Sequence, residues 1–554
     1  MSNTVPDLLN PSLAPIGVQR GTLSAEALVG ASALALPVAP AAAGETEVQP
    51  RWGTADAALL YGIDLAELAV RSGATGEGGN IGVLHLPRPV GDKTFPWHDL
   101  PLCIYLVGIG SATPQDLRRA GAALARRVRS HAEHVPANSR TITTVGAEAK
   151  ADAVRAFLEG FYLGGYRQAR WTGTGLAEIT GDVAAVGAED DALDNDFFTD
   201  EDEPQPGSAA ENELLLVGRH PEQAVALSQA GARATLRTRA LAATPSHIKN
   251  PQWFVEQAQS LANQVGLKTE VWDLERLEAE GFGGILAVGG GSASEPRLLT
   301  LSYEPEATTG QHVVLIGKGI TYDTGGLSIK PREAMVGMKT DMAGGAAVLA
   351  AIVGAAELRV SQRITAVIPL AENAVSGSAY RPGDVVRTYG GRTVEIANTD
   401  AEGRMVLADA LAWADENLDP DVMIDVATLT GAATLGLGRG HAAAYCANPE
   451  VIAQLGEAGE QTGERIWHMP LVEEYHPAVT SNVAQLRHVP NAEHRYSAGS
   501  ITAALFLREF VGDRQWVHLD IAGPARATAA KHEIPQGATG YGARLLLRWL
   551  ENAS

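Results

Sequence analysis

The chain has 554 residues, of which 45% are hydrophobic, and it carries 60 glycines, 29 prolines and a net charge of −22. This length exceeds one ordinary hydrophobic core, so we expect two or more domains, and the composition is typical of a globular α/β protein. The acidic balance argues against a nucleic-acid partner, since such proteins normally present a basic face to phosphates. Two cysteines, Cys103 and Cys446, lack metal-type spacing and indicate a reducing compartment, so we predict a cytoplasmic protein.

The beginning of the chain predicts a flexible leader at residues 1–28 and no membrane segment. The uncharged stretch 27–44 is long enough to span a bilayer on paper, but it is alanine-rich and interrupted by Pro37 and Pro40. It starts too late for a signal peptide and follows Glu26. We predict instead that it holds the first buried strand, at 32–40.

Residues 29–220 are predicted to form a smaller N-terminal α/β domain. Strands are expected at 102–108 and 213–218, and helical spacing is found at 117–131. The segment 189–213 contains eleven Asp or Glu and no Lys or Arg, and it has no apolar periodicity, so we predict a disordered acidic insertion. A linker helix at 221–243 then leads to the second domain.

Residues 244–554 alternate between short apolar runs and helical stretches, which favours a C-terminal α/β domain with a central mixed, mostly parallel sheet. Helices are expected at 343–358, where an alanine-rich apolar run indicates burial, and at 405–417. Strands are predicted at 284–288, 312–316, 364–370, 393–397, 422–428 and 516–521.

Charged residues follow several of these predicted strands. One cluster spans Lys318 to Lys330 and includes Asp323, and the other spans Asp400 to Arg404 and includes Glu402; Asp341 precedes the buried helix. Ligands of open α/β sheets collect outside the carboxyl ends of strands. Hard oxygen ligands in this number, without His or Cys, suit a pair of divalent cations. The pattern therefore predicts a two-metal hydrolase.

Each of these residues also has a plainer interpretation. Asp400 and Glu402 could form the acidic first turn of a helix, which is a common arrangement. Arg404 speaks against that alternative, because an arginine in the first turn opposes the helix dipole and is better explained by an anion or a reaction. Lys318 could be an ordinary surface lysine, and it could ligate a metal only as the neutral amine.

Two strings carry a family resemblance. Residues 317–326, Gly-Lys-Gly-Ile-Thr-Tyr-Asp-Thr-Gly-Gly, and 398–404, Asn-Thr-Asp-Ala-Glu-Gly-Arg, resemble the signatures of the leucyl aminopeptidase family, also called cytosol aminopeptidases. The resemblance continues through 427–432 and 516–523, and it covers about residues 235–554. It implies a metal-dependent aminopeptidase that acts on peptides, assembled as a homohexamer.

The resemblance also implies roles for individual positions. Lys318, Asp323, Asp341, Asp400 and Glu402 would bind two metal ions, manganese or zinc. Lys330 would polarise the scissile carbonyl, and Arg404 would hold a bicarbonate ion that relays a proton. The positions that would line the substrate cleft are Lys330, Met338, Asn398, Thr428, Leu429 and Gly431. A methionine in the first pocket would favour Leu or Met at the substrate's amino end, but ordinary core packing explains Met338 equally well.

Two other functions were weighed against this one. A two-metal phosphoesterase would use the same oxygen-rich ligands. A DNA-architectural role, which some members of the family add, is disfavoured by the acidic balance. The scattered histidines His441, His468, His476, His488 and His494 show no ligand spacing, and we predict surface or supporting positions for them.

Overall fold

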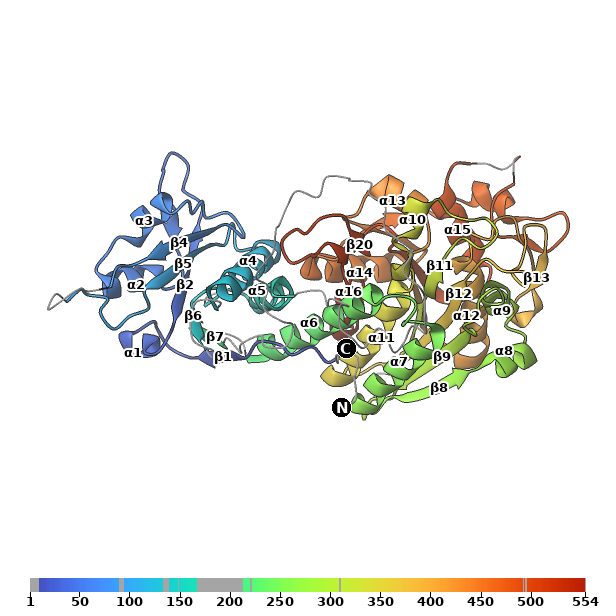
Figure 1. Cartoon of the computed structure of the whole chain (residues 1–554), viewed down its shortest axis with the longest axis horizontal. Coiled ribbons are helices and arrows are strands. Elements are labelled where there is room, and N and C mark those ends of the chain that lie inside the picture. The colour runs from blue at the N-terminus through green and yellow to red at the C-terminus, as the bar shows by residue number, and fades with distance from the viewer. Residues whose placement is uncertain are drawn as a thin grey trace, which may run out of the picture.

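The computed structural model describes residues 9–88, 94–132, 139–147, 149–166, 213–219, 222–307, 310–491, 493 and 496–553. In this part of the chain two α/β lobes lie next to each other along the long axis, with the N-terminal lobe at the left of Figure 1 and the C-terminal lobe at the right. The acidic insertion predicted at 189–213 lies outside the described residues, except for Glu213.

The N-terminal lobe is built on a sheet that is parallel over most of its width. Among the described residues its strand order is β1-β7-β6-β2-β5-β4, with β3 added beside β2. The strands are β1 Ile16–Gln19, β2 Ala33–Ala39, β3 Gln49–Pro50, β4 Ile81–His85, β5 Cys103–Gly108, β6 Arg140–Thr143 and β7 Glu213–Val217. Part of the predicted leader thus contributes an edge strand, since β1 pairs in parallel with β7.

Helices cover both faces of this sheet. They are α1 Ala25–Leu28, α2 Thr54–Tyr61, α3 Leu65–Arg71, α4 Pro114–Ala132 and α5 Ala151–Gly164. Along β2, Ala33 and Ala35 pack toward α4 and α5, and Leu34 and Leu36 pack toward α2 and α3. Because successive strand residues face opposite sides, a continuous apolar run is required where both faces are buried.

Helix α6, Glu222–Ala243, joins the two lobes and lies between them in Figure 1. It packs against α5 on one side and against α11 and α16 of the C-terminal lobe on the other. The linker helix expected at 221–243 is therefore a helix that contacts both lobes.

The C-terminal lobe contains the larger sheet, which is mixed and mostly parallel at its centre as predicted. Its order in the described chain is β17-β16-β19-β15-β10-β12-β9-β8, with β11 beside β12. The strands are β8 Lys268–Trp272, β9 Arg297–Tyr303, β10 His312–Gly317, β11 Gly319–Asp323, β12 Arg363–Asn373, β15 Val422–Ala427, β16 Ala442–Cys446, β17 Ile466–Met469 and β19 Gln515–Asp520. Strands β12, β10, β15 and β19 are parallel neighbours, so their carboxyl ends share one edge.

Two helical layers enclose this sheet. The first contains α7 Pro251–Val265, α11 Ala343–Leu358, α14 Pro449–Thr462 and α16 Ala543–Asn552. The second contains α8 Leu274–Glu280, α9 Gly283–Gly289, α12 Gly403–Leu418 and α15 Gly499–Arg508. Short helices α10 Arg332–Met335 and α13 Gly431–Leu437, with 3-10 turns η2 Met338–Thr340, η3 Tyr389–Gly391 and η4 Glu473–Val479, lie in the connections.

One strand prediction was wrong, and another strand lies in a different sheet than the large one. The apolar run 284–288 lies in helix α9, because the buried Asp409 carboxylate accepts the Ile285 N–H at 2.8 Å and holds the start of that helix. A short apolar run cannot by itself distinguish a strand from a buried helix. The run 393–397 does form a strand, β14 Thr393–Glu395, but it pairs with β13 Val385–Arg387 and β18 Leu486–Arg487 in a separate small sheet.

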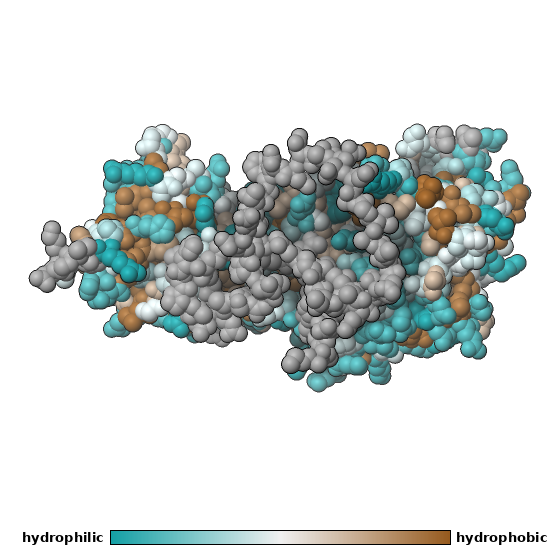
Figure 2. All heavy atoms as spheres, viewed as in Figure 1, coloured by the Kyte–Doolittle hydropathy of each residue, from teal (hydrophilic) through white to brown (hydrophobic). Residues whose placement is uncertain are grey.

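One helical stretch in the described residues, Arg332–Leu358, is long and apolar enough to cross a membrane, and 83% of its most apolar window is buried. Its main part is α11, whose residues belong to the core between the large sheet and α16. Where the face in Figure 2 is coloured, hydrophilic and apolar residues are interspersed over both lobes.

Candidate active site

The charged residues predicted from the sequence meet at the carboxyl edge of the large sheet. Lys318 directly follows β10, and Asp323 ends β11. Asp341 lies between η2 and α11, and Asp400 and Glu402 lie in the loop before α12. The backbone of Lys318 is fixed on two sides, because its N–H donates to Val426 and its carbonyl accepts from Gly345.

The carboxylates surround two lysine ammonium groups. Oxygens of Asp323, Asp400 and Glu402 lie within 4.8 Å of one another. The Lys318 Nζ lies 2.8 Å from Glu402 Oε1 and 2.9 Å from Asp341 Oδ2. The Lys330 Nζ lies 2.8 Å from Asp323 Oδ2 and also contacts Asp400. All five ligand positions and Lys330 therefore belong to one cluster.

Burial and neighbouring charge shift the pKa values of the carboxylates in opposite directions. Desolvation, together with the charge of Glu402, raises the pKa of Asp323 to about 6. Desolvation raises the pKa of Asp341 to about 8, although Lys318 opposes it. Burial also disfavours ionisation of Glu402, but the ammonium groups of Lys318 and Lys330 hold its pKa at about 2. The negative charge of the four carboxylates thus exceeds the positive charge of the two lysines.

The carboxylate oxygens of the cluster are suitable ligands for divalent cations. Oxygens are what hard cations bind, and four carboxylates close together need more positive charge than two ammonium groups supply. Two of their oxygens, Asp341 Oδ2 and Asp400 Oδ1, are buried and pair with the ammonium groups of Lys318 and Lys330, but they accept no hydrogen bond of normal geometry from any described residue. A cation bound beside these oxygens would give them the partner that buried acceptors normally have. Lys318 and Asp341 would face one ion, and Glu402 and Asp323 lie between the two lysines.

The surrounding backbone is shaped to bring these groups together. A Cβ atom at Gly403 would lie 2.6 Å from Lys318 Cε, so a larger residue there would push the end of the lysine side chain away from its position beside Glu402. Asn373, at the end of β12, donates from Nδ2 to Asp323 Oδ1 at 2.8 Å and to the Thr399 carbonyl at 3.0 Å. It therefore ties the loop that carries Asp400 to the strand that carries Asp323.

Arg404 is buried at the start of α12, and a histidine supports it. Its Nη1 donates to the His488 carbonyl at 2.5 Å, and its Nε has no hydrogen-bond partner among the described residues. Burial lowers the pKa of Arg404 to about 10, so it remains cationic near neutral pH. A buried guanidinium with a free N–H is suited to an oxyanion.

His488 is fully buried, not a surface residue, and it holds the same loop. Its Nε2 lies 2.9 Å from the Asn398 carbonyl, and its Nδ1 accepts the Ala397 N–H at 3.3 Å. Burial and the charge of Arg404 lower the pKa of His488 to about 3, so the ring is neutral. Because Nδ1 accepts from Ala397, the ring proton is assigned to Nε2, which donates to the Asn398 carbonyl. His494 lies outside the described residues.

The predicted cleft residues lie around the cluster. Thr428 and Leu429 follow β15 and are half-buried, and Gly431 begins α13 and is exposed. Met338 is half-buried in η2, close in sequence to Asp341, and Asn398 is half-buried ahead of Asp400. The Thr428 carbonyl accepts from Lys318 Nζ at 3.0 Å, so this loop directly contacts the cluster.

Sequence reasoning missed Asn373 and left open whether His488 lies at the surface or supports the site. Asn373 carried a usable signal, because it is a polar residue just after a predicted strand, like the residues that were recognised. His488 had no such signal, since its partners lie about ninety residues away in the chain.

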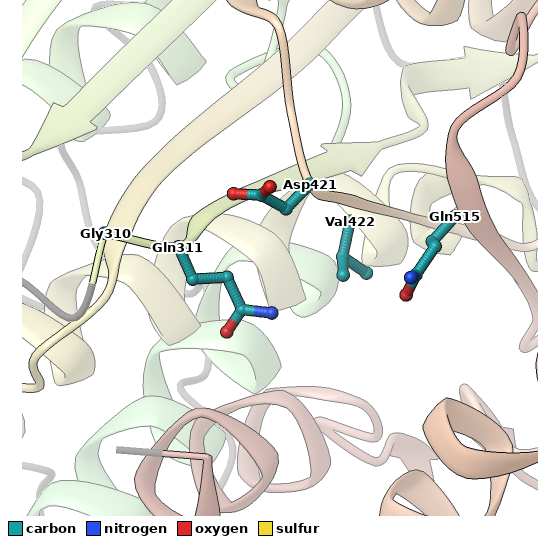
Figure 3. Close-up of a pocket in the computed structure, with 5 residues that line it drawn as sticks. All are labelled: Gly310, Gln311, Asp421, Val422 and Gln515. Carbon is teal, nitrogen blue, oxygen red and sulfur yellow. The ribbon is translucent and has the colours of Figure 1, made fainter.

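A separate hollow of about 370 Å³, lined by Gly310, Gln311, Asp421, Val422 and Gln515, is shown in Figure 3. Gln311 precedes β10, Asp421 precedes β15, and Gln515 begins β19, so the hollow lies at the amino ends of these parallel strands. The charged cluster lies at their carboxyl ends. The Asp421 carboxylate is already engaged, because it accepts the His312 N–H at 2.7 Å.

Fold and site together are those of an α/β protein with a buried carboxylate cluster that suits divalent cations. Residues 236–547 match the catalytic domain of the cytosol aminopeptidase family. A probable cytosol aminopeptidase of Syntrophotalea carbinolica is 37% identical over 454 residues, covering 81% of this chain and 85% of that protein. One of Corynebacterium efficiens is 40% identical over 454 residues, covering 81% and 82%.

A solved structure, the bottromycin maturation enzyme BotP in complex with Mn, superposes with a TM-score of 0.75 at 31% identity, covering 94% of this chain and 99% of that chain. The chain belongs to the cytosol aminopeptidase family. It is therefore an aminopeptidase, a metal-dependent hydrolase that acts on the amino ends of peptides.

Proposed function

We propose that this aminopeptidase releases leucine and other apolar residues from peptides, using two divalent cations held by Lys318, Asp323, Asp341, Asp400 and Glu402. The observation that carries the proposal is the convergence of these five side chains, from separate segments, on one buried cluster. Manganese is the first candidate and zinc the second, and the manganese complex of BotP supports that order.

The lysines and the carboxylates of the cluster would have different tasks. Two bound cations would supply an activated water and polarise the substrate carbonyl. Asp323 and Glu402 lie between the lysines and are the proposed bridging carboxylates. Lys318 must release its proton to act as a ligand. Lys330 remains an ammonium and stabilises the negative charge that develops on the carbonyl oxygen.

Arg404 is the proposed holder of a bicarbonate ion that relays the proton. Its buried cation and unpartnered Nε support this assignment. His488 keeps the guanidinium in place through its carbonyl and keeps Asn398 in place through its ring.

The substrate would lie against Asn398, Thr428, Leu429 and Gly431, with its first side chain beside Met338. Half-buried Leu429 and Met338 supply apolar surface next to the charged cluster. Apolar side chains at the substrate's amino end gain from that contact, and the flexible thioether of methionine adapts to several of them.

We further propose a cytoplasmic homohexamer in which residues 244–554 form the catalytic unit and 29–220 the N-terminal domain. The segment 327–336, which contains Lys330 and helix α10, exposes Leu327, Ile329 and Val336, at 44%, 63% and 72% of their surfaces. A second subunit would cover such apolar side chains beside the site. Light scattering after size exclusion tests the assembly, and a monomeric active enzyme would refute it.

Hydrolysis of a leucine anilide tests the function. The enzyme is stripped with a chelator, and manganese, zinc, cobalt or magnesium is then returned in separate samples. We expect loss of activity on stripping and its return with manganese or zinc at two ions per chain. A nitrophenyl phosphate assay runs in parallel, and preferential hydrolysis of that ester would favour the phosphoesterase instead.

A further inference from the structure

Strand β19 contains three buried polar side chains to which the proposed mechanism gives no role. Trp516, His518 and Asp520 are spaced two apart and therefore face the same side of the sheet. Two of them bind Asp425 on the neighbouring strand β15: Trp516 Nε1 donates to Oδ2 at 2.8 Å, and His518 Nδ1 lies 2.6 Å from Oδ1. They lock β19 to β15, which leaves Asp520 fixed at the strand end.

Asp520 is fully buried and accepts hydrogen bonds from the loop after β15. Its Oδ1 accepts the N–H groups of Leu429 at 3.1 Å, Thr430 at 3.3 Å and Ala522 at 3.2 Å. Its Oδ2 accepts the Thr430 hydroxyl at 2.6 Å. Hydrogen bonds to an ionised carboxylate are about twice as strong as neutral ones.

The same loop is held from the opposite side by the charged cluster of the candidate active site. The Thr428 carbonyl accepts from Lys318 Nζ at 3.0 Å, and the Thr428 hydroxyl donates to Asp341 Oδ1 at 2.7 Å. The Thr428 carbonyl and the Leu429 N–H belong to one planar peptide unit and point in opposite directions. One peptide plane is therefore clamped between Asp520 and Lys318.

We propose that Asp520 is a positioning residue of the aminopeptidase site, whose carboxylate fixes the loop 428–431 in the orientation that presents Thr428, Leu429 and Gly431 to the substrate. The inference rests on the proposed function, because the substrate contacts of these three residues are assigned there. An amide at 520 would turn one acceptor oxygen into a donor facing Thr430 Oγ1, which already accepts the Ala433 N–H at 3.1 Å. It would therefore loosen the loop without changing side-chain size.

The test compares Asp520→Asn with Asp409→Asn at saturating manganese. Asp409 is a matched control: it is also a fully buried carboxylate and accepts two backbone N–H groups, from Ile285 and Tyr389 at 2.8 Å, but it does not touch the loop. For Asp520→Asn we expect the KM for leucine anilide to rise ~10-fold, with kcat within ~3-fold of wild type, because loss of a hydrogen bond to a charged group weakens binding of substrate and transition state alike. Asp409→Asn should keep the wild-type KM at a comparable loss of thermal stability.

A third variant, Thr430→Val, keeps Asp520 and removes only the hydroxyl that contacts it. A rise in KM in this variant, with little further rise when Asp520→Asn is added, supports the inference, since the two changes break one contact. An unchanged KM in Asp520→Asn, or in Thr430→Val where Asp520→Asn does not fold, overturns it. An equal rise in Asp409→Asn also overturns it. An inactive wild-type enzyme with both metals would instead refute the proposed function.

Discussion

At the scale of single residues, the charge of the cluster depends on each carboxylate. Asp400→Asn and Glu402→Gln each remove one negative charge that two dications need, and an amide cannot replace it. We expect activity to be abolished and metal content to fall while the circular dichroism spectrum is kept. Glu256→Gln, at an exposed carboxylate of α7, should behave as wild type. Full activity with undiminished metal in either cluster variant would refute the ligand assignment.

Arg404 should be separable from the metal ligands. Arg404→Ala removes the proposed anion holder and leaves every carboxylate, so both metals should remain and KM should change little. Turnover should fall by ~10²–10⁴-fold, because proton transfer assists only the transition state. Wild type should respond to bicarbonate after degassing, and the variant should not. Unchanged turnover would remove Arg404 from the mechanism.

The stability of the folded protein should depend on pH through the protonation of His488. In the unfolded chain its ring takes up a proton below about pH 6.5, whereas burial and Arg404 keep it neutral in the folded chain down to about pH 3. Because the unfolded state binds more protons between these values, stability falls as the pH is lowered, by up to about 1.4 kcal/mol per pH unit.

The melting temperature of His488→Gln should therefore fall less than that of wild type when the pH is lowered from 7.5 to 5. His247→Gln, at an exposed histidine, should keep the wild-type dependence. Equal pH dependence in all three proteins would show that His488 is protonated in the fold.

At the scale of elements, the position of α11 depends on a glycine. A Cβ atom at Gly344 would lie 2.0 Å from the Val426 carbonyl oxygen of β15, and backbone cannot move aside cheaply. Gly344→Ala should destabilise the protein by about 1–3 kcal/mol or more. Since α11 begins just after Asp341, the affinity for metal should fall as well.

Gly456→Ala is the matched change in α14, where an added Cβ meets nothing within 4 Å. It should stabilise the protein by about 0.5–1 kcal/mol through helix propensity alone. Thermal melts of both variants and a manganese titration test the pair, and a Gly344→Ala protein as stable as wild type would contradict the packing.

At the scale of the whole molecule, a buried ionic network joins the two lobes. Glu159 of α5 is fully buried; its Oε1 lies 2.9 Å from Arg155 Nε, and its Oε2 lies 3.5 Å from Arg544 Nη1 of α16. Arg118 of α4 and Arg548 of α16 each approach it to 3.9 Å. One carboxylate thus compensates arginines from both lobes.

Glu159→Gln should destabilise the molecule by about 3–5 kcal/mol, because it removes the carboxylate that pairs with the buried Arg118 and leaves Arg155, Arg544 and Arg548 with only their other carboxylate partners. Calorimetry should show the lobes melting in two steps. Glu67→Gln, which breaks the exposed pair with Arg71, should change stability by less than about 1 kcal/mol. A single transition at the wild-type temperature would show that the network does not couple the lobes.

The sequence by itself determined which charged residues form the cluster and how strands and helices alternate along the chain. The carboxylates and lysines stand in two short strings, and Asp323 and Lys318 follow a strand that its β-branched run already predicted. Buried strands such as β2, β10 and β15, and helix α11, were recognisable because a continuous run of apolar residues is a local property of the sequence. The fold class follows from that alternation.

The tertiary structure alone decided how these strings meet and what supports them. Helix α9 and the small sheet of β13, β14 and β18 depend on partners such as Asp409, which lies 124 residues from Ile285. The burial of His488 depends on Asn398 and Arg404, and the role of Asp520 depends on the loop after β15. No local pattern encodes such pairs, because a hydrogen bond between distant segments is specified only when packing brings their strands to one edge of the sheet.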